Sequence, residues 1–476
     1  MSAAGPAIQT DIPARLDRLP WSRFHALVVL ALGITWVLDG LEVTIVGSLG
    51  PILQDQRTLN LSAQDVGSVA SFYVIGAVVG ALGFGWLTDR LGRRLIFNVT
   101  LGIYVVGVLL SAFAWDFWSF AAFRVITGLG IGGEYAAINS AIDELIPARL
   151  RGRIDLMVNG SYWLGAAAGA AASIPLLSGH MVSIDIGWRL GFGIGAVLGM
   201  FILVLRRFVP ESPRWLVTHG RNDEARRTVD DIERRVEETG GGALAKAEGI
   251  LTVHPRVSFG FGLIFTAMLG NYKGRSVLAL TLMTAQAFLF NAVFFTYGLV
   301  LSNYEHVAAT DIGLYVLPLC IGNFFGPLLL GPLFDTIGRR RMIAGTYGLT
   351  GVLLIGVAVL FGLGLLDART QTIAWVVVFF FASAASSSAY LTASEIFPLE
   401  TRALAIAVFY ALGTLIGGAA APALFGWLIG LQSAWALSGG YAVAAVLMIV
   451  GAVAEVYLGI DCEGKSLESI AEPLSA

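Results

Sequence analysis

Residues 85–94, Gly-Trp-Leu-Thr-Asp-Arg-Leu-Gly-Arg-Arg, have a counterpart 246 residues later in residues 331–340, Gly-Pro-Leu-Phe-Asp-Thr-Ile-Gly-Arg-Arg. A second motif, Glu-x-x-Pro-x-x-x-Arg, spans residues 144–151 and recurs 251 residues later at residues 395–402. Each copy follows a long apolar run. Two motifs repeated at nearly one spacing predict two homologous halves, an arrangement that binds a solute between the halves near the bilayer midplane.

The composition is that of a polytopic membrane protein. Hydrophobic residues make up 56% of the 476 residues and charged residues only 13%, whereas soluble domains carry about 25% charged residues. The net charge of −3 and the lack of a basic stripe argue against nucleic-acid binding. Cys320 and Cys462 lie in a predicted span and in the tail, so we expect no disulfide framework, metal site or cofactor.

Twelve apolar runs are long enough to cross a bilayer as helices. They lie near 25–48, 64–87, 95–114, 117–141, 154–178, 188–207, 276–301, 309–333, 342–364, 371–394, 403–429 and 433–458. We predict an all-α membrane protein with twelve transmembrane helices. Its parts are a first half of residues 1–207, a cytoplasmic linker of residues 208–275 with short helices near 210–217 and 222–238, and a second half of residues 276–476.

Arginine residues predict the orientation. They cluster after the second, fourth and eighth spans and in the linker, whereas only Arg57, Arg189 and Arg369 lie at or near the opposite loops. The positive-inside rule places both termini and the linker in the cytoplasm of a cell whose inner membrane holds the chain. Residues 1–19 lack a basic region followed by an apolar one, so we expect no cleaved signal peptide.

Two acids interrupt the first apolar run, and we consider them the candidate site for proton coupling. Asp39 and Glu42 share one helical face, and Gly40 between them leaves room for a close neighbour. Carboxylates at this depth are costly, so they indicate a route for protons or solute. The alternative is that both acids face a water-filled vestibule and have no role in transport.

Arg124 of the fourth span and Glu42 each lie about 9 Å below the outer membrane surface, which predicts an ion pair between them. We predict that this pair gates Asp39, which is left unpaired nearer the midplane and carries the proton. The alternative is a salt bridge that only supports packing. Glu134, further along the fourth span, is either a second relay carboxylate or a cap for neighbouring hydroxyl groups.

The repeated motifs predict a cytoplasmic gate. An Asp at a helix end can pair with the Arg residues of the following loop and with nearby helix ends, and both contacts break when this side opens. Arginines kept only for topology would not explain the fixed Asp-to-Arg spacing. The predicted gate residues are Asp89, Arg93, Glu144, Arg151, Glu211, Arg214, Asp335, Arg339, Glu395 and Arg402.

These motifs resemble the signature of the major facilitator superfamily. Residues 210–216, Pro-Glu-Ser-Pro-Arg-Trp-Leu, and residues 463–468, Glu-Gly-Lys-Ser-Leu-Glu, resemble hallmarks of its sugar-porter family. Gln286 and Asn291 resemble the polar pair with which sugar porters hold hydroxyl groups. The resemblance implies the fold of that superfamily and transport by alternating access.

Departures from the sugar-porter pattern favour a different solute. Residues 383–390 read Ser-Ala-Ala-Ser-Ser-Ser-Ala-Tyr in place of a Gly-Pro-rich stretch with a Trp, Trp163 stands where sugar porters have Gln, and Ala285 replaces a second Gln. Fewer hydrogen-bond partners disfavour a polyol, and aromatic side chains suit a flat solute. Packing is the alternative role for these aromatics. The candidate binding residues are Tyr162, Trp163, Gln286, Phe290, Asn291, Phe294, Tyr390 and Tyr410.

The Asp-Gly-x-acid motif at 39–42 and the Arg-x-x-x-Gly-x-Gly-x-Gly-Gly-Glu motif at 124–134 are similar to bacterial organic-acid and niacin-type proton symporters and to synaptic vesicle glycoproteins. This resemblance implies a proton-coupled symporter of a small organic carboxylate. The alternatives are a sugar carrier, proton-coupled or facilitative, and a receptor on a transporter fold. No nucleophile–base, P-loop or metal spacing indicates an enzyme. We expect a monomer whose partners are solute, protons and the lipid bilayer.

Overall fold

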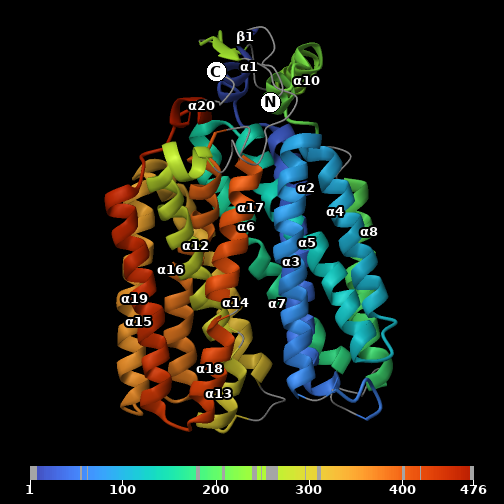
Figure 1. Cartoon of the computed structure of the whole chain (residues 1–476), viewed down its shortest axis with the longest axis vertical. Helices are drawn as coiled ribbons and strands as arrows, with labels where there is room; N and C mark the ends of the chain where they lie inside the picture. The colour runs from blue at the N-terminus through green and yellow to red at the C-terminus, as the bar shows by residue number, and fades with distance from the viewer. Residues whose placement is uncertain are drawn as a thin grey trace.

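The computed structural model describes residues 8–53, 56–61, 63–177, 183–205, 209–238, 244–247, 249–253, 266–294, 296–307, 312–398, 402–418 and 420–471. Nearly all of its regular structure is helical, so the all-α prediction is confirmed. Two bundles of helices stand side by side (Figure 1).

The first bundle comes from the N-terminal part of the chain. Helix α5 packs against α3 and α4, and α2 packs against α7 and α8. A 3₁₀ turn over Ala148–Leu150 leads into α6. The helices are α2 (Arg23–Leu53), α3 (Ala63–Leu91), α4 (Arg93–Ser111), α5 (Phe117–Leu145), α6 (Arg151–Gly160), α7 (Tyr162–Leu177) and α8 (Ile184–Leu205).

The second bundle is built in the same manner from the C-terminal part. Helix α19 packs against α15 and α12, and α14 packs against α16. The helices are α12 (Lys273–Phe294), α13 (Tyr297–Tyr304), α14 (Ile312–Thr336), α15 (Arg339–Gly362), α16 (Ala368–Glu395), α17 (Arg402–Gly413), α18 (Ala420–Gly430) and α19 (Ala434–Leu458), with π-helical turns η4 (Ala267–Asn271) and η6 (Thr414–Gly418).

The two bundles meet along α3, α5, α6 and α7 of the first and α14, α16 and α17 of the second. Helix α14 packs against α6 and α7, and α17 packs against α3 and α5. Contacts between α16 and α6 add to this interface. The boundaries that the sequence suggests for the two halves and the linker stay a prediction.

Nine helices of the described chain are long and apolar enough to cross a membrane: α2, α3, α4, α8, α12, α14, α15, α16 and α19. The other three predicted spans correspond to α5, to α6 and α7, and to α17, η6 and α18. Helix α5 carries Arg124, Glu134, Asp143 and Glu144, which lower its mean hydropathy. Helices α6 and α7 are separated at Ser161, and the π-helical turn η6 separates α17 from α18.

Short elements gather at the end of the bundles where both termini lie, which we call the terminal end (Figure 1). They include β1 (Ile8–Thr10), α1 (Ile12–Asp17), α9 (Pro213–Thr218), α10 (Asn222–Val236), β2 (Leu251–Val253) and α20 (Leu467–Ile470). Helices α9 and α10 match the two short linker helices that the sequence predicts. The antiparallel pairing of β1 with β2 was not predicted, because it joins segments far apart in the chain.

Glycine residues let α2 and α7 approach closely beside Asp39. A Cβ atom at Gly40 would lie 1.9 Å from the backbone oxygen of Tyr162, and one at Gly165 would lie 1.8 Å from that of Val37. Backbone atoms cannot yield as a flexible side chain can, so only glycine fits. The prediction that Gly40 leaves room for a close neighbour is confirmed.

We expect Gly40→Ala to lower the apparent melting temperature in detergent, because the added methyl group must push α2 and α7 apart, at a cost of about 1–3 kcal/mol. The measurement is thermal unfolding of the purified protein. Gly83→Ala is the matched control, since no heavy atom lies within 4 Å of a Cβ built there. An equal loss in both variants would contradict the close-packing explanation.

Candidate functional site

A cavity of about 210 Å³ lies between the two bundles. Seven of the eight candidate binding residues line it, and the side chain of the eighth, Phe294, lies outside the described part of the structure. Asp39, the predicted proton site, and Ser383, Ser386 and Ser387 of the stretch that departs from the sugar-porter pattern line it as well. The other lining residues were not predicted, because the rotation of each helix about its axis decides which side chains face the cavity. The complete lining is Trp36, Asp39, Val43, Tyr73, Val74, Tyr135, Asn159, Tyr162, Trp163, Gln286, Ala287, Phe290, Asn291, Ser383, Ser386, Ser387, Tyr390, Tyr410 and Thr414.

Asp39 is fully buried on α2 and is the acid of the cavity lining. The hydroxyl group of Tyr135 on α5 donates a hydrogen bond to Oδ2 at 2.5 Å, and that of Tyr73 on α3 donates to Oδ1 at 3.2 Å. The expectation that Asp39 is left unpaired is therefore wrong. Helices α3 and α5 pack against one another beside α2, which brings both tyrosines to it, and sequence spacing could not reveal this packing.

Glu42 and Arg124 form a buried ion pair one turn further along α2. The guanidinium carbon of Arg124 also lies 4.5 Å from the centre of the Tyr73 ring, in a cation–π contact. Because Tyr73 donates to Asp39, continuous contacts run from Glu42 through Arg124 and Tyr73 to Asp39. The ion pair between Glu42 and Arg124 agrees with the prediction made from their equal depth in the membrane. The role of this pair as a gate stays a prediction.

Glu134 is fully buried on α5, immediately before Tyr135 in the chain. It does not belong to the cavity lining, whereas Tyr135 does. Neither of the two roles considered for Glu134 is decided by this position. Both stay predictions.

An aromatic cluster that we call the tyrosine cluster joins the two bundles at the cavity. Tyr135 stacks on Trp36 with ring centres 4.6 Å apart, and its edge contacts Tyr410 of the second bundle at 4.9 Å. Tyr390 lies 6.2 Å from Tyr410 and 5.9 Å from Trp36. These four residues, Trp36, Tyr135, Tyr390 and Tyr410, therefore line the cavity and pack on one another.

A second aromatic contact crosses between the bundles on another wall. Trp163 of α7 stacks against Phe290 of α12 with ring centres 5.5 Å apart, and Tyr162 contacts the edge of Trp163 at 5.1 Å. Two groups of aromatic side chains therefore line the cavity. Such walls suit a flat, apolar ring.

Polar groups form the rest of the lining. Ser386 donates a hydrogen bond to Oε1 of Gln286 at 2.8 Å, which leaves the amide N–H₂ of Gln286 as a donor group. Asn291 donates to the Ala287 carbonyl at 2.7 Å through one of its two amide hydrogens. Among the described lining residues there is no Lys, Arg or His.

The predicted gate residues form an ionic network at the terminal end. Arg93 binds Glu144 at 2.8 Å and Asp89 at 3.3 Å in the first bundle. In the second bundle Arg339 makes the equivalent contacts. It binds Glu395 at 3.0 Å and Asp335 at 2.7 Å. The repeated motifs therefore form the same buried triad twice.

Two aspartates also cross between the bundles. Asp335 accepts hydrogen bonds from the backbone N–H groups of Gly152 at 3.1 Å and Arg153 at 2.8 Å, in the first turn of α6. Asp89 accepts one from Leu404 at 2.9 Å, in the first turn of α17. Each bundle thus caps a helix N-terminus of the other, where backbone N–H groups lack partners within the helix.

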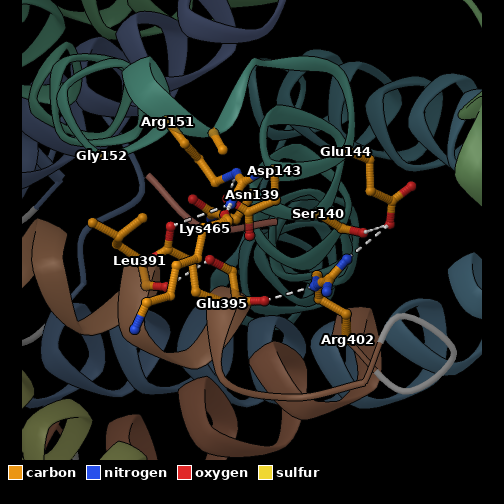
Figure 2. A network of polar contacts seen from close by, with 12 residues as sticks. Asn139, Ser140, Asp143, Glu144, Arg151, Gly152, Leu391, Glu395, Arg402 and Lys465 are labelled. Carbon is orange, nitrogen blue, oxygen red and sulfur yellow. Dashed lines mark hydrogen bonds and ion pairs between the residues drawn. The ribbon is translucent and has the colours of Figure 1, made fainter. Parts of the chain in front are cut away.

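Arginines add longer contacts across the same interface. Arg151 of α6 lies 3.6 Å from Glu395, and Arg402 of α17 lies 3.8 Å from Glu144. Figure 2 shows Arg402 directed toward Glu144 and Ser140 from the opposite bundle. Asp143 lies beside this network, 4.0 Å from Arg151.

Two linker residues predicted for the gate, Glu211 and Arg214, bind segments next to the ionic network. Glu211 accepts hydrogen bonds from the N–H groups of Arg93 and Arg94 at the start of α4, and burial raises the pKa of this carboxyl despite those bonds. Arg214 binds Asp17 of α1 at 3.0 Å and also Glu468 of α20. The N-terminal arm, the linker and the tail therefore meet at one arginine.

Sequence reasoning missed the role of Glu463. Its carboxylate accepts a hydrogen bond from the N–H group of Arg339 at the start of α15, as Glu211 does at α4. The two acids lie in dissimilar segments, the linker and the tail. Both acids lie in segments that resemble sugar-porter hallmarks, residues 210–216 and 463–468, but this resemblance did not indicate the contact with the start of α4 or α15.

Known proteins resemble this chain over nearly its full length. The family described as "Sugar (and other) transporter" matches residues 39–474. The niacin transporter NiaP of Acinetobacter baylyi is 28% identical over 97% of this chain and 99% of its own length. The 4-hydroxybenzoate transporter PcaK of the same organism is 25% identical over 85% of both chains. The major facilitator superfamily proton:xylose symporter XylE has a similar fold, with a TM-score of 0.76 at 20% identity, covering 94% of this chain and 98% of XylE.

We expect Asp335→Ala to lower the apparent melting temperature in detergent, because the backbone N–H groups of Gly152 and Arg153 lose their acceptor. The cost is about 1–3 kcal/mol for a buried group and is smaller for the exposed N–H group of Arg153. Asp335→Asn keeps one acceptor oxygen and should fall between Asp335→Ala and the wild type. Asp231→Ala is the control, since its ion pairs with Arg234 and Arg235 are exposed and contribute at most about 1 kcal/mol. An Asp335→Ala variant as stable as Asp231→Ala would contradict the capping role.

Proposed function

We propose that this chain carries a small aromatic carboxylate together with a proton by alternating access. The chain belongs to the sugar (and other) transporter family of the major facilitator superfamily, so it is a transporter of small organic solutes rather than an enzyme. The observation that supports this proposal best is the buried Asp39, a single acid in an aromatic cavity between two bundles.

The shape of the cavity supports a single-ring solute. Its volume of about 210 Å³ lies just below the range of about 300–1,000 Å³ usual for drug-sized ligands. The pair of Trp163 and Phe290 and the tyrosine cluster give the cavity two groups of aromatic lining residues. Niacin and 4-hydroxybenzoate, named for two relatives, are both single aromatic rings with one carboxyl group.

The charges of the cavity support coupling to a proton. A bound carboxylate and an ionised Asp39 would be two anions in one low-dielectric space, and no described lining residue supplies a positive charge. Proton binding to Asp39 removes this repulsion, so solute and proton bind together. The carboxylate of the solute can then accept hydrogen bonds from Gln286, Asn291 and the hydroxyl groups of the lining.

The ionic network supports alternating access. Its contacts between bundles, including the two reciprocal aspartate caps, all lie at the terminal end. We propose that this end faces the cytoplasm, as the arginine distribution indicates, that the chain lies in the inner membrane as a monomer, and that the network opens to release solute inward. Glu42 and Arg124, held next to Asp39 through Tyr73, would adjust its exposure to protons.

A sugar carrier is the second candidate. Gln286 and Asn291, which resemble the sugar-binding pair, both line the cavity, and Gln286 is hydrogen-bonded to Ser386. A counterflow panel in proteoliposomes separates the two candidates. We expect exchange of single-ring aromatic carboxylates and no exchange of pentoses or hexoses. The opposite result would favour the sugar carrier over the carboxylate carrier.

We expect Asp39→Asn to abolish uptake driven by a proton gradient while solute counterflow continues and loses its dependence on pH, because the amide stays neutral throughout. Concentrative and counterflow uptake are measured in the same proteoliposomes. Asp185→Asn, at a half-exposed acid near the start of α8, is the matched control and should behave as the wild type. Full concentrative uptake by Asp39→Asn would refute the assignment.

A further inference from the structure

We infer that Tyr135 is a positioning residue that links the proton on Asp39 to closure of the cavity on its terminal side. This inference rests on the proposed function. The side chain of Tyr135 contacts both bundles. Its hydroxyl group donates to Asp39 at 2.5 Å, within the first bundle, while its ring contacts Tyr410 at 4.9 Å and Tyr390 at 6.5 Å, both in the second bundle.

The tyrosine cluster lies between the cavity and the ionic network. Tyr390 precedes Glu395 by five residues on α16, Tyr410 follows Arg402 by eight on α17, and Tyr135 precedes Glu144 by nine on α5. At about 1.5 Å per residue these rings lie roughly 7–14 Å inside the network. Because the same rings line the cavity, they form its wall toward the terminal end.

Opening of the terminal end must disturb this wall. The helices α16 and α17 that carry Tyr390 and Tyr410 belong to the second bundle, so separating the bundles removes the rings that support Tyr135 on one side. The ring of Tyr135 then keeps its stacking on Trp36, and its hydroxyl group keeps the bond to Asp39. The hydrogen bond to Asp39 therefore decides whether the side chain of Tyr135 can move with Tyr390 and Tyr410 when the bundles separate.

The bond depends on the charge of Asp39. A buried carboxylate needs hydrogen-bond donors, and losing one is costly. An ionised Asp39 therefore holds Tyr135 in the closed wall, whereas a protonated Asp39 can itself donate and needs Tyr135 less. Proton binding thus frees Tyr135, and the empty, unprotonated carrier stays closed at the terminal end.

Other ionisable groups surround Asp39. Of these, Tyr73 is the second donor, but its ring supports Arg124 of its own bundle. Only Tyr135 combines a bond to Asp39 with ring contacts across the interface among the described residues. The groups around Asp39 are Glu42 on its own helix, Tyr73 on α3, Tyr104 on α4, Arg124, Glu134 and Tyr135 on α5, Tyr162 on α7, Tyr390 on α16 and Tyr410 on α17.

The test measures opening without solute. A reporter cysteine, Ser387→Cys, is placed in the cavity lining of the full chain, with Cys320 and Cys462 changed to Ala. An impermeant maleimide is applied from the terminal end at acid and alkaline pH. A second protein carries its reporter cysteine at the exposed tail position instead, as Ser469→Cys. The labelling rate at residue 387 is divided by the labelling rate at residue 469 at the same pH, which corrects for the higher reactivity of any thiol at alkaline pH.

In the parent we expect labelling to be about tenfold faster at acid than at alkaline pH, the factor expected for one hydrogen bond to a charged group. Tyr135→Phe keeps the ring and removes the donor, so labelling should stay fast at both pH values, within about twofold. Tyr347→Phe and Tyr304→Phe, at two tyrosines of the second bundle that do not line the cavity, are matched controls that should keep the dependence of the parent.

Two failures can be told apart. If the parent shows no pH dependence and Asp39→Asn labels as the parent does, the proposed function fails. If Asp39→Asn labels fast at both pH values but Tyr135→Phe keeps the parent's dependence, or either control loses it as well, the inference about Tyr135 is overturned.

A second variant covers the case in which Tyr135→Phe does not elute as a single folded species. Tyr410→Ala removes the ring that lies 4.9 Å from Tyr135 and leaves the bond to Asp39 in place. Faster labelling at alkaline pH supports the inference. Labelling at the parent's rate overturns it.

Discussion

A helix that begins inside a protein interface must find acceptors for its first backbone N–H groups, and in this molecule the acceptors come from the opposite bundle. Asp335 binds the start of α6 and Asp89 binds the start of α17. Each aspartate is also held by an arginine of its own bundle, Arg339 or Arg93. The bundles are thus joined at the terminal end by groups that neither could satisfy alone, and the cavity lies behind this junction.

Helix α5 connects the parts of the molecule that bear charge. Arg124, Tyr135 and Glu144 lie along it in turn, and the first and last are about 30 Å apart at 1.5 Å per residue. They contact Glu42, then Asp39, then the ionic network. Helix α5 packs along its length on α3 and α4, so one element of the first bundle positions all three of these side chains.

Much of the architecture could be predicted because it depends on local composition. Long apolar runs predict spans, and the repeated motifs predict pairing of an Asp with an Arg of the following loop, as Asp89 pairs with Arg93 and Asp335 with Arg339. The glutamate that completes each triad was predicted for the gate but not as the partner of these arginines. The Glu42–Arg124 pair could be anticipated from helix rise alone, since two charges at equal depth in apolar surroundings require one another. Most candidate binding residues were found because they share segments with recognisable motifs.

The amino-acid sequence by itself determined a membrane protein of two repeated halves, with a buried acid in its first span and an arginine-rich end, because length, hydropathy and repeated spacing are properties of the chain. Only the tertiary structure decided that Asp39 has Tyr73 and Tyr135 as partners, that Trp36 joins the tyrosine cluster, and that the aspartate caps cross between bundles. These contacts join residues on different helices, and the rotation of each helix about its axis is set by packing against its neighbours.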